Sequence, residues 1–184
     1  MRPLPVAAPS TRRAFTLLEL MTALVIIGIL VVVLSPSITY LRARAQKVAC
    51  IANLRSLHVA TGNYIHDNHH WPQIALAPPG DPEHAKGWIN ALEPYGLGRN
   101  NWVCPAIQQA LGSPDLSLPE NARVDYYGTT FNSQEQSPFK YPKQPWFIET
   151  ADMHGNGQEI LFPDGHIEEA ADIVRQGKAT SGNH

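Results

Sequence analysis

Charged residues and catalytic motifs are scarce in this chain of 184 residues. Only 16% of the residues carry a charge and the net charge is -2, so electrostatics gives no case for nucleic acid as a partner. The sequence holds no Gly-x-Ser-x-Gly, no phosphate-binding loop and no Cys/His pair with a known signature, and we therefore predict no enzyme activity. It also lacks an internal repeat of about 20 to 50 residues, which argues against repeat architectures.

Cysteine is equally scarce, with Cys50 and Cys104 as the only two. An even number is compatible with one disulfide if the domain lies outside the cytosol. Such a bridge would close a loop of about 54 residues and contribute roughly 4 kcal/mol in the chain-entropy model. Two buried free thiols are the alternative. A zinc site is not predicted, because the sequence lacks two more ligands at the proper spacing.

Apolar residues and proline are plentiful, in different parts of the chain. From Phe15 to Leu34 the only polar residues are Thr16, Glu19 and Thr22. A helix of about 20 residues spans about 30 Å, the thickness of a bilayer core. The run therefore predicts a membrane-spanning helix, and the 16 prolines elsewhere suit a loop-rich globular part.

The apolar helix has several possible explanations, and they differ in whether they account for the carboxylate of Glu19. A secretory signal peptide would end in a small-x-small cleavage site after the apolar run, and none is present. A plain signal anchor explains the length, and Arg12 and Arg13 before it, but not Glu19. An acid inside a spanning helix costs roughly 2.5–3.5 kcal/mol and by default indicates a function. The simpler alternative is that Glu19 reaches toward the headgroups.

The stretch AFTLLELMTALVIIGIL, from Ala14 to Leu30, resembles the leader of type IV pilins and type II secretion pseudopilins. The resemblance implies that prepilin peptidase cleaves between Ala14 and Phe15 on the cytoplasmic side and that the new amine of Phe15 is methylated. The family usually has glycine where Ala14 stands. Alanine is also small and should still fit the peptidase.

The resemblance also implies a role for Glu19 in assembly. Glu19 lies four residues after Phe15, on nearly the same helical face, and can offset the amine of its own chain or of a neighbouring subunit. In pilins the second pairing applies, so Glu19 is expected to set the register between subunits.

Location and partners follow from the same resemblance. It implies a single-pass protein of the bacterial inner membrane, with residues 1–14 in the cytoplasm and the C-terminal domain outside it. After assembly the protein would be part of a periplasmic or surface filament. The implied partners are other copies of the chain, other pilin-like subunits, prepilin peptidase, the inner-membrane assembly platform and membrane lipid.

The helical period continues beyond the apolar run. Through residues 37–66, apolar side chains recur at steps of three and four residues. We predict one helix from about Phe15 to Ile65, kinked at Pro36 because proline removes a backbone hydrogen bond. Two helices broken at residues 35–37 are the alternative. The predicted fold is α+β: a long helix, transmembrane and then amphipathic, packed on a small antiparallel sheet with extensive loops, the pilin-like lollipop.

The predicted head covers residues 67–175, and its elements are marked by turn residues and by alternation. Pro72 ends the long helix, residues 75–87 form a loop, and residues 88–98 form a short helical turn. Cys104 ends a short strand or loop. Strands are predicted within residues 126–132 and 145–152, and a hairpin within 158–170 around Asp164-Gly165. Residues 176–184 are predicted to be a disordered tail.

A second resemblance concerns the C-terminal half. His154, nine further residues and then Asp164-Gly165 resemble the His-x9-Asp-Gly motif of a prepilin-like family with the same leader, although Met153 stands where that family has arginine. The motif has a metal-binding interpretation and a structural one, in which Asp164 stabilises the turn and His154 bonds the backbone. The candidate nitrogen and oxygen ligands are Asp152, His154, Asp164 and His166.

Two further metal interpretations are weaker. Major secretion pseudopilins bind calcium through a loop rich in acids, and no clear cluster of acids is present in the corresponding loop. We therefore predict no cofactor, with a divalent metal such as calcium as the minor alternative. His66, His69 and His70 have a spacing that suits incidental metal binding, but a solvated helix end explains them better.

The sequence thus predicts a structural subunit of a type IV pilus-like or type II secretion pseudopilus filament. The alternative is a membrane-anchored extracytoplasmic binding module or enzyme that uses a pilin-type anchor. A minor pilin that caps a filament often lacks the glutamate, so Glu19 favours a repeating subunit. The modest size and the Asp-Gly hairpin favour a secretion pseudopilus over an adhesive, motility or DNA-uptake pilus.

Overall fold

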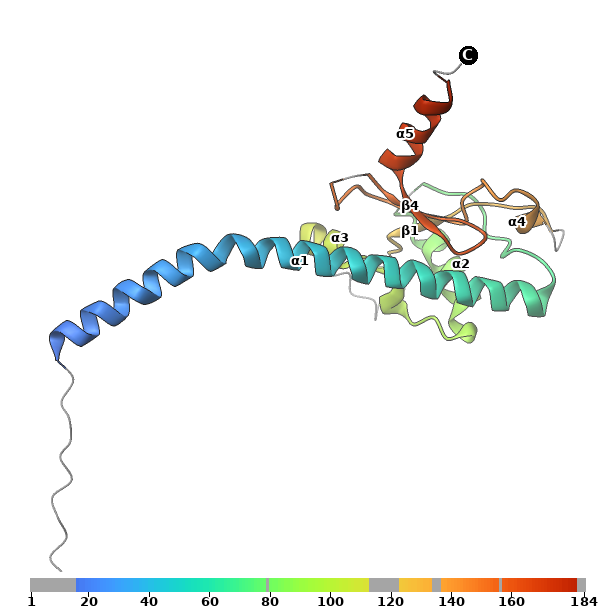
Figure 1. Ribbon diagram of the computed structural model, residues 1–184. Helices are drawn as coiled ribbons and strands as arrows, with labels where there is room; N and C mark the ends of the chain where they lie inside the picture. Colours follow the sequence, from blue (N-terminus) through green and yellow to red (C-terminus); the bar gives the residue numbers. More distant parts are fainter. Residues whose placement is uncertain (1–15, 79, 113–122, 134–136, 156, 182–184) are drawn as a thin grey trace, which may run out of the picture. The chain divides into compact units, whose positions relative to one another are not determined.

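The computed structural model describes residues 16–78, 80–112, 123–133, 137–155 and 157–181. The chain divides into two compact units, Met1–Leu41 and Arg42–His184 (Figure 1). Each unit is described by itself. The predicted cleavage pair, Ala14 and Phe15, lies outside the described residues.

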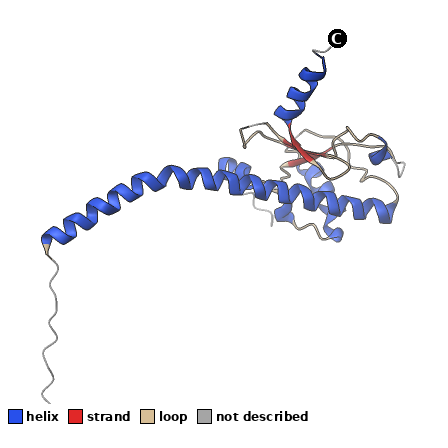
Figure 2. Ribbon diagram, in the orientation of Figure 1, coloured by secondary structure: helices blue, strands red, loops and turns tan. Residues whose placement is uncertain are grey.

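Helix α1 (Leu17–Asn68) runs without interruption for 52 residues, as Figure 2 shows. The alternative of two helices broken at residues 35–37 is therefore wrong. Side-chain hydroxyls support the backbone near Pro36: Ser35 Oγ donates to the Val31 carbonyl at 2.8 Å, and Thr39 Oγ1 donates to the Ser35 carbonyl at 3.1 Å. The kink at Pro36 stays a prediction.

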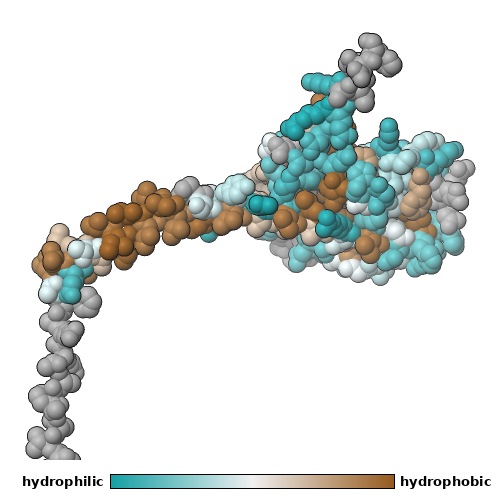
Figure 3. All heavy atoms as spheres, viewed as in Figure 1, coloured by the Kyte–Doolittle hydropathy of each residue, from teal (hydrophilic) through white to brown (hydrophobic). Residues whose placement is uncertain are grey.

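In the first unit, α1 is apolar on every side. The large apolar side chains from Leu17 to Leu34 are between 52% and 76% exposed (Figure 3). A helix that is hydrophobic all round needs an apolar environment, either a protein core or a lipid bilayer. None of the most apolar stretch is buried within the structure, and by length and composition it can cross a membrane.

In the second unit, the later part of α1 carries an apolar stripe at helical spacing. Its members are buried in the same core as the sheet: Cys50, Leu54, Leu57, Ala60 and Ile65. The predicted packing of the amphipathic part is confirmed from Cys50 onward, whereas Ile38, Leu41 and Val48 of the predicted stripe are exposed. Burial of this face, rather than helix propensity, fixes where this part of α1 lies in the head.

The sheet has four antiparallel strands in the order β1-β2-β3-β4. Strand β2 pairs with both β1 and β3, so that Phe147 opposes Gly128 on one side and Leu161 on the other. The predicted strands and the hairpin at Asp164-Gly165 are confirmed, and the fold is α+β. The strands are β1 (Tyr126–Gly128), β2 (Phe147–Glu149), β3 (Glu159–Leu161) and β4 (Ile167–Glu169).

Short helices precede and interrupt the strands along the chain, and one of them begins where a loop was predicted. Asp81 Oδ1 accepts a hydrogen bond from His84 N at 2.8 Å and Pro82 occupies the first turn, so a helix begins inside the predicted loop 75–87. Proline there suits a helix start as well as a loop. The short helices are α2 (Pro82–Leu92), η1 (Glu93–Tyr95), η2 (Arg99–Trp102), α3 (Pro105–Leu111) and α4 (Ser137–Lys140).

The C-terminal prediction is wrong as well. Helix α5 (Ala170–Ser181) covers most of the segment predicted as a disordered tail, and residues 182–184 lie outside the described part. Alanine and glutamine are good helix formers, and Asp172 pairs with Arg175 one turn later at 3.0 Å. These local preferences outweigh the Gly and Ser content of the tail.

All four tryptophans of the chain lie in the core of the head. Trp71 contacts Trp146 edge to face with ring centroids 5.2 Å apart, and Trp88 contacts Phe147 in the same way at 5.1 Å. The indole nitrogen of Trp71 donates to the Thr129 carbonyl at 2.9 Å. This aromatic core fixes β2, and β2 places Glu149 beside α1.

Candidate functional site

Thr16 and Glu19 form a capping box at the start of α1. Glu19 Oε2 accepts hydrogen bonds from Thr16 N at 2.9 Å and from Thr16 Oγ1 at 3.0 Å. In return, Thr16 Oγ1 accepts a hydrogen bond from Glu19 N at 3.2 Å. Two N–H groups that a helix start leaves unpaired are satisfied in this way.

Glu19 therefore has a local structural role that the sequence analysis missed, although a threonine three residues before a glutamate is a signature of this box. Its carboxylate also lies in the first turn, where the helix dipole favours negative charge. The predicted pairing with the Phe15 amine involves a residue outside the described part, and it stays a prediction.

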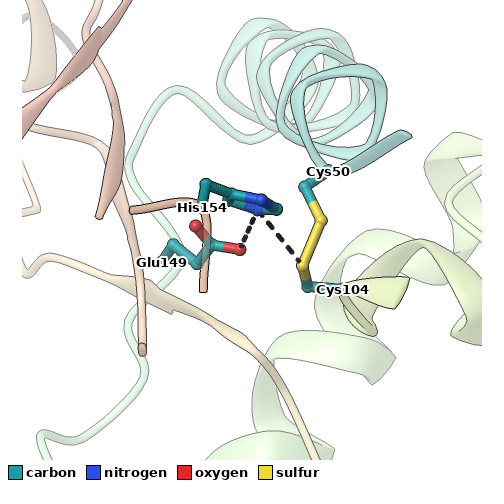
Figure 4. Close-up of side chains that lie close together, drawn as sticks. All are labelled: Cys50, Cys104, Glu149 and His154. Atoms are coloured by element: carbon teal, nitrogen blue, oxygen red, sulfur yellow. Dashed lines mark hydrogen bonds and ion pairs between the residues drawn. A yellow bond between two sulfur atoms is a disulfide. The ribbon is translucent and has the colours of Figure 1, made fainter. Parts of the chain in front are cut away.

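In the head, Cys50 and Cys104 form a disulfide between α1 and the start of α3, and both are fully buried (Figure 4). Their Cα atoms are 5.2 Å apart. Of the two possibilities left open by the sequence, the structure has the bridge. It joins α1 covalently to a segment 54 residues away.

Beside the disulfide lie a histidine and an acid that come from other segments. Nε2 of His154 is 3.8 Å from Cys104 Sγ and 3.4 Å from Glu149 Oε1. The side chains of His154 and Glu149 are 3% and 0% exposed. One ligand atom from each of Cys50, Cys104, Glu149 and His154 lies within 4.8 Å of the other three. We call these four residues the Cys-Glu-His cluster.

Burial controls the protonation of the two titratable members. Loss of hydration raises the pKa of Glu149 to about 7, and the nearby carboxylates of Glu159 and Asp125 act in the same direction. Loss of hydration also lowers the pKa of His154. The imidazole is thus neutral at neutral pH, while the Glu149 carboxyl stands near its midpoint. Because the imidazole is neutral, the 3.4 Å approach of His154 Nε2 to Glu149 Oε1 is not a permanent ion pair.

The two halves of the His-x9-Asp-Gly motif lie in different parts of the structure. His154 belongs to the Cys-Glu-His cluster. Asp164 Oδ1 accepts a hydrogen bond from His166 N at 3.1 Å and also contacts the His166 ring. Gly165 has φ +84°, and a Cβ there would lie 3.2 Å from the ring of His58. The Asp-Gly half therefore makes a turn that packs against α1.

The four predicted metal ligands are not brought together. Asp152 Oδ1 accepts a hydrogen bond from Gly155 N at 3.1 Å, and Asp164 and His166 bond each other in the hairpin turn. Among the described residues, the group with metal-binding geometry contains His154 but none of the other three. The metal-binding interpretation therefore does not hold for these four residues as a set, and Asp164 stabilises the turn, as the structural interpretation expects.

The three histidines with a spacing that suits incidental metal binding, His66, His69 and His70, lie at the end of α1. His66 is 87% exposed at its side chain and contacts Asp67 at 3.0 Å, while His70 Nδ1 lies 2.9 Å from the Trp71 carbonyl. Local contacts of this kind suit a solvated helix end.

Sequence reasoning also missed the buried acids of the head. Glu149 alternates with Phe147 in β2, and this period places both on the buried face. Glu159 is 2% exposed and pairs with Lys47 of α1 at 3.3 Å; Lys47 also contacts Glu169. The sequence signal that could have predicted a buried acid was Glu149, two residues after the core residue Phe147 in a strand.

Comparison with known proteins concerns the N-terminal helix. A family model described as the prokaryotic N-terminal methylation motif matches residues 9–35. The chain carries this methylation motif. The matched range contains Ala14, Phe15 and Glu19, so the predicted kind of leader is confirmed, while its cleavage stays a prediction.

The chain is also similar to a secretion protein. It is 37% identical over 65 residues to the type II secretion system core protein G of Escherichia coli (strain K12). This match covers 35% of the chain and 45% of the relative, less than half of that protein. No solved structure matches the chain significantly. The methylation motif and this similarity together favour a pilin-type or pseudopilin-type subunit over an enzyme.

Proposed function

We propose that this protein is a pseudopilin-like subunit that is stored in the membrane and polymerises through α1. The observation that carries the proposal is the methylation motif at residues 9–35 on a helix that is apolar on every side from Leu17 to Leu34. Such a surface is stable either in lipid or among the same helices of other subunits. One segment can therefore serve as membrane anchor and as filament core.

The proposed processing and location follow from this segment. Prepilin peptidase would cleave between Ala14 and Phe15 at the cytoplasmic face of the inner membrane. The second unit, Arg42–His184, which contains the head, would lie outside the cytoplasm, where a disulfide such as Cys50–Cys104 persists. Similarity to the secretion relative favours a type II secretion-type pseudopilus, with other pilin-like subunits and an assembly platform as partners.

Glu19 would set the stagger of the subunits. A charged group buried without a partner in an apolar bundle is strongly destabilising, so the carboxylate and the Phe15 amine of an adjoining copy select one register. An open head-to-tail contact of this kind repeats into a helical filament.

The test separates the charge of Glu19 from its capping role. Glu19→Gln keeps an N-cap partner for Thr16, because glutamine also completes a capping box, but it removes the charge. Thr16→Val removes the cap hydroxyl and keeps the charge. Filaments are counted by electron microscopy and shear recovery in cells expressing each full-length variant, and membrane insertion is measured by fractionation.

We expect Glu19→Gln to reduce filaments at least about ten-fold with normal insertion, since one unpaired buried charge costs more than the 1.4 kcal/mol that a ten-fold change requires. Thr16→Val should assemble nearly normally. Normal filaments with Glu19→Gln would contradict the role of Glu19 in setting the register, and a wild-type chain that inserts but forms no filaments would favour a membrane-anchored module that uses α1 only as an anchor.

A further inference from the structure

The Cys-Glu-His cluster gathers four side chains whose ligand atoms are of the three types that zinc binds in proteins. It presents two sulfurs, one imidazole nitrogen and one carboxylate oxygen, from α1, the start of α3, the end of β2 and the loop that contains His154 (Figure 4). The residues are far apart in the sequence, which is why the sequence gives no zinc signature. We propose that, when the Cys50–Cys104 disulfide is reduced, these four residues bind one Zn²⁺ ion in tetrahedral geometry.

The separations between the ligand atoms suit such a site. Zinc bonds of about 2.0–2.3 Å at tetrahedral angles place neighbouring ligand atoms about 3.3–3.8 Å apart. His154 Nε2 already lies 3.4 Å from Glu149 Oε1 and 3.8 Å from Cys104 Sγ. The four ligand atoms lie within 4.8 Å of one another, so once the S–S bond is broken the two sulfurs must separate to nonbonded distance and any longer separation must close by up to about 1 Å.

The carboxylate of Glu149 points to a ligand independently of the cysteines. The residue is fully buried. Its Oε1 accepts no hydrogen bond from any of the described residues. A buried carboxylate oxygen without a donor costs free energy, so its retention needs a reason. Zinc at the centre of the cluster supplies one.

Neighbouring groups hold the ligands in place, as outer-shell contacts do at metal sites. Glu159 N donates to Glu149 Oε2 at 3.4 Å, which leaves Oε1 facing the cluster. Cys104 N donates to Asp125 Oδ2 at 2.9 Å, and Arg123 pairs with the same carboxylate at 2.9 Å. These bonds depend on neither a disulfide nor a metal.

Electrons and protons balance in the conversion between the disulfide state and the zinc-bound dithiolate state. A dithiol reductant delivers two electrons and two protons, the S–S bond breaks, and the reductant becomes a disulfide. The two protein thiols then release two protons as two Zn–S bonds form. In an oxidising compartment the reverse reaction expels zinc and restores the disulfide. Either state joins α1 to the head through Cys50 and Cys104.

The experiment uses the full-length protein in detergent, oxidised or reduced with a phosphine, which competes weakly for zinc. The probes are Zn²⁺, counted per chain by elemental analysis, and Co²⁺, whose visible bands report tetrahedral geometry and whose near-ultraviolet band reports thiolate ligands. The variants are His154→Gln and Glu149→Gln, with Asp164→Asn as the matched control. Circular dichroism reports folding in parallel.

We expect one zinc per reduced chain, none per oxidised chain, and affinity at least about ten-fold weaker in His154→Gln and Glu149→Gln but unchanged in Asp164→Asn. If reduction unfolds the head, zinc should restore its circular dichroism. A reduced chain that binds no zinc, a cobalt spectrum without thiolate bands, or unchanged affinity in His154→Gln would overturn the proposal. These outcomes do not depend on filament assembly.

Discussion

At the residue scale, Glu19 has a capping role in the structure and a proposed role in assembly. Its carboxylate closes a capping box with Thr16 and lies in the first turn of α1. Both features favour a negative charge at this place in an otherwise apolar helix. The same position suits an amine at residue 15. A cap alone needs no charge, so neutral glutamine distinguishes the two roles.

Gly128 is the glycine with the least room in the head. A Cβ added there would lie 2.2 Å from the ring of Trp88 in the aromatic core. We expect Gly128→Ala to lower the free energy of unfolding by about 3 kcal/mol, because the buried indole must shift to admit a methyl group. Urea unfolding followed by tryptophan fluorescence measures the change.

The matched control for this substitution is Gly62→Ala. Gly62 lies within α1, and a Cβ there would contact nothing within 4 Å. Replacing glycine by alanine in an open helical position should raise the free energy of unfolding by about 0.5–1 kcal/mol. If both variants lose stability equally, the close approach of Gly128 to Trp88 has no energetic meaning.

At the scale of the elements, the hairpin turn between β3 and β4 depends on pH. The hydrogen bonds from the His166 side chain and backbone hold the pKa of Asp164 below its ordinary value. An acid whose pKa is lowered by folding stabilises the fold above its ordinary pKa, and this stabilisation is lost as pH falls through the lowered value.

We therefore expect the carboxyl carbon of Asp164 to titrate below pH 3.8 in a carbon-13 NMR experiment on the folded protein. His166→Gln should move the titration back toward the ordinary value, since a neutral amide is a weaker partner. An Asp164 titration unaffected by His166→Gln would show that the turn does not use this bond.

The elements also show what the sequence could predict. The long helix followed from an apolar run and a stripe of apolar residues, and β1 to β4 followed from alternation and an Asp-Gly turn. Helices α2 and α5 were missed where Pro, Gly and Ser outweighed an Asp81 cap and an Asp172–Arg175 pair. The cluster was missed because only the folded chain brings Glu149 and His154 to Cys50 and Cys104.

At the scale of the whole molecule, the two units have different physical requirements. The first needs an apolar environment for the exposed stretch from Leu17 to Leu34. The second has its own core, its own sheet and a disulfide. This division suits a subunit whose helix enters a bundle while its head meets water, and the family match at residues 9–35 lies within the first unit.

Mass spectrometry of the N-terminus of the membrane-extracted protein tests the central claim most directly. A subunit processed as proposed should yield a chain that begins at Phe15 with a methylated amine and lacks residues 1–14. The Glu19→Gln variant should be processed in the same way, because cleavage precedes assembly. An intact Met1 in the mature protein, or cleavage after Leu34, would contradict the claim.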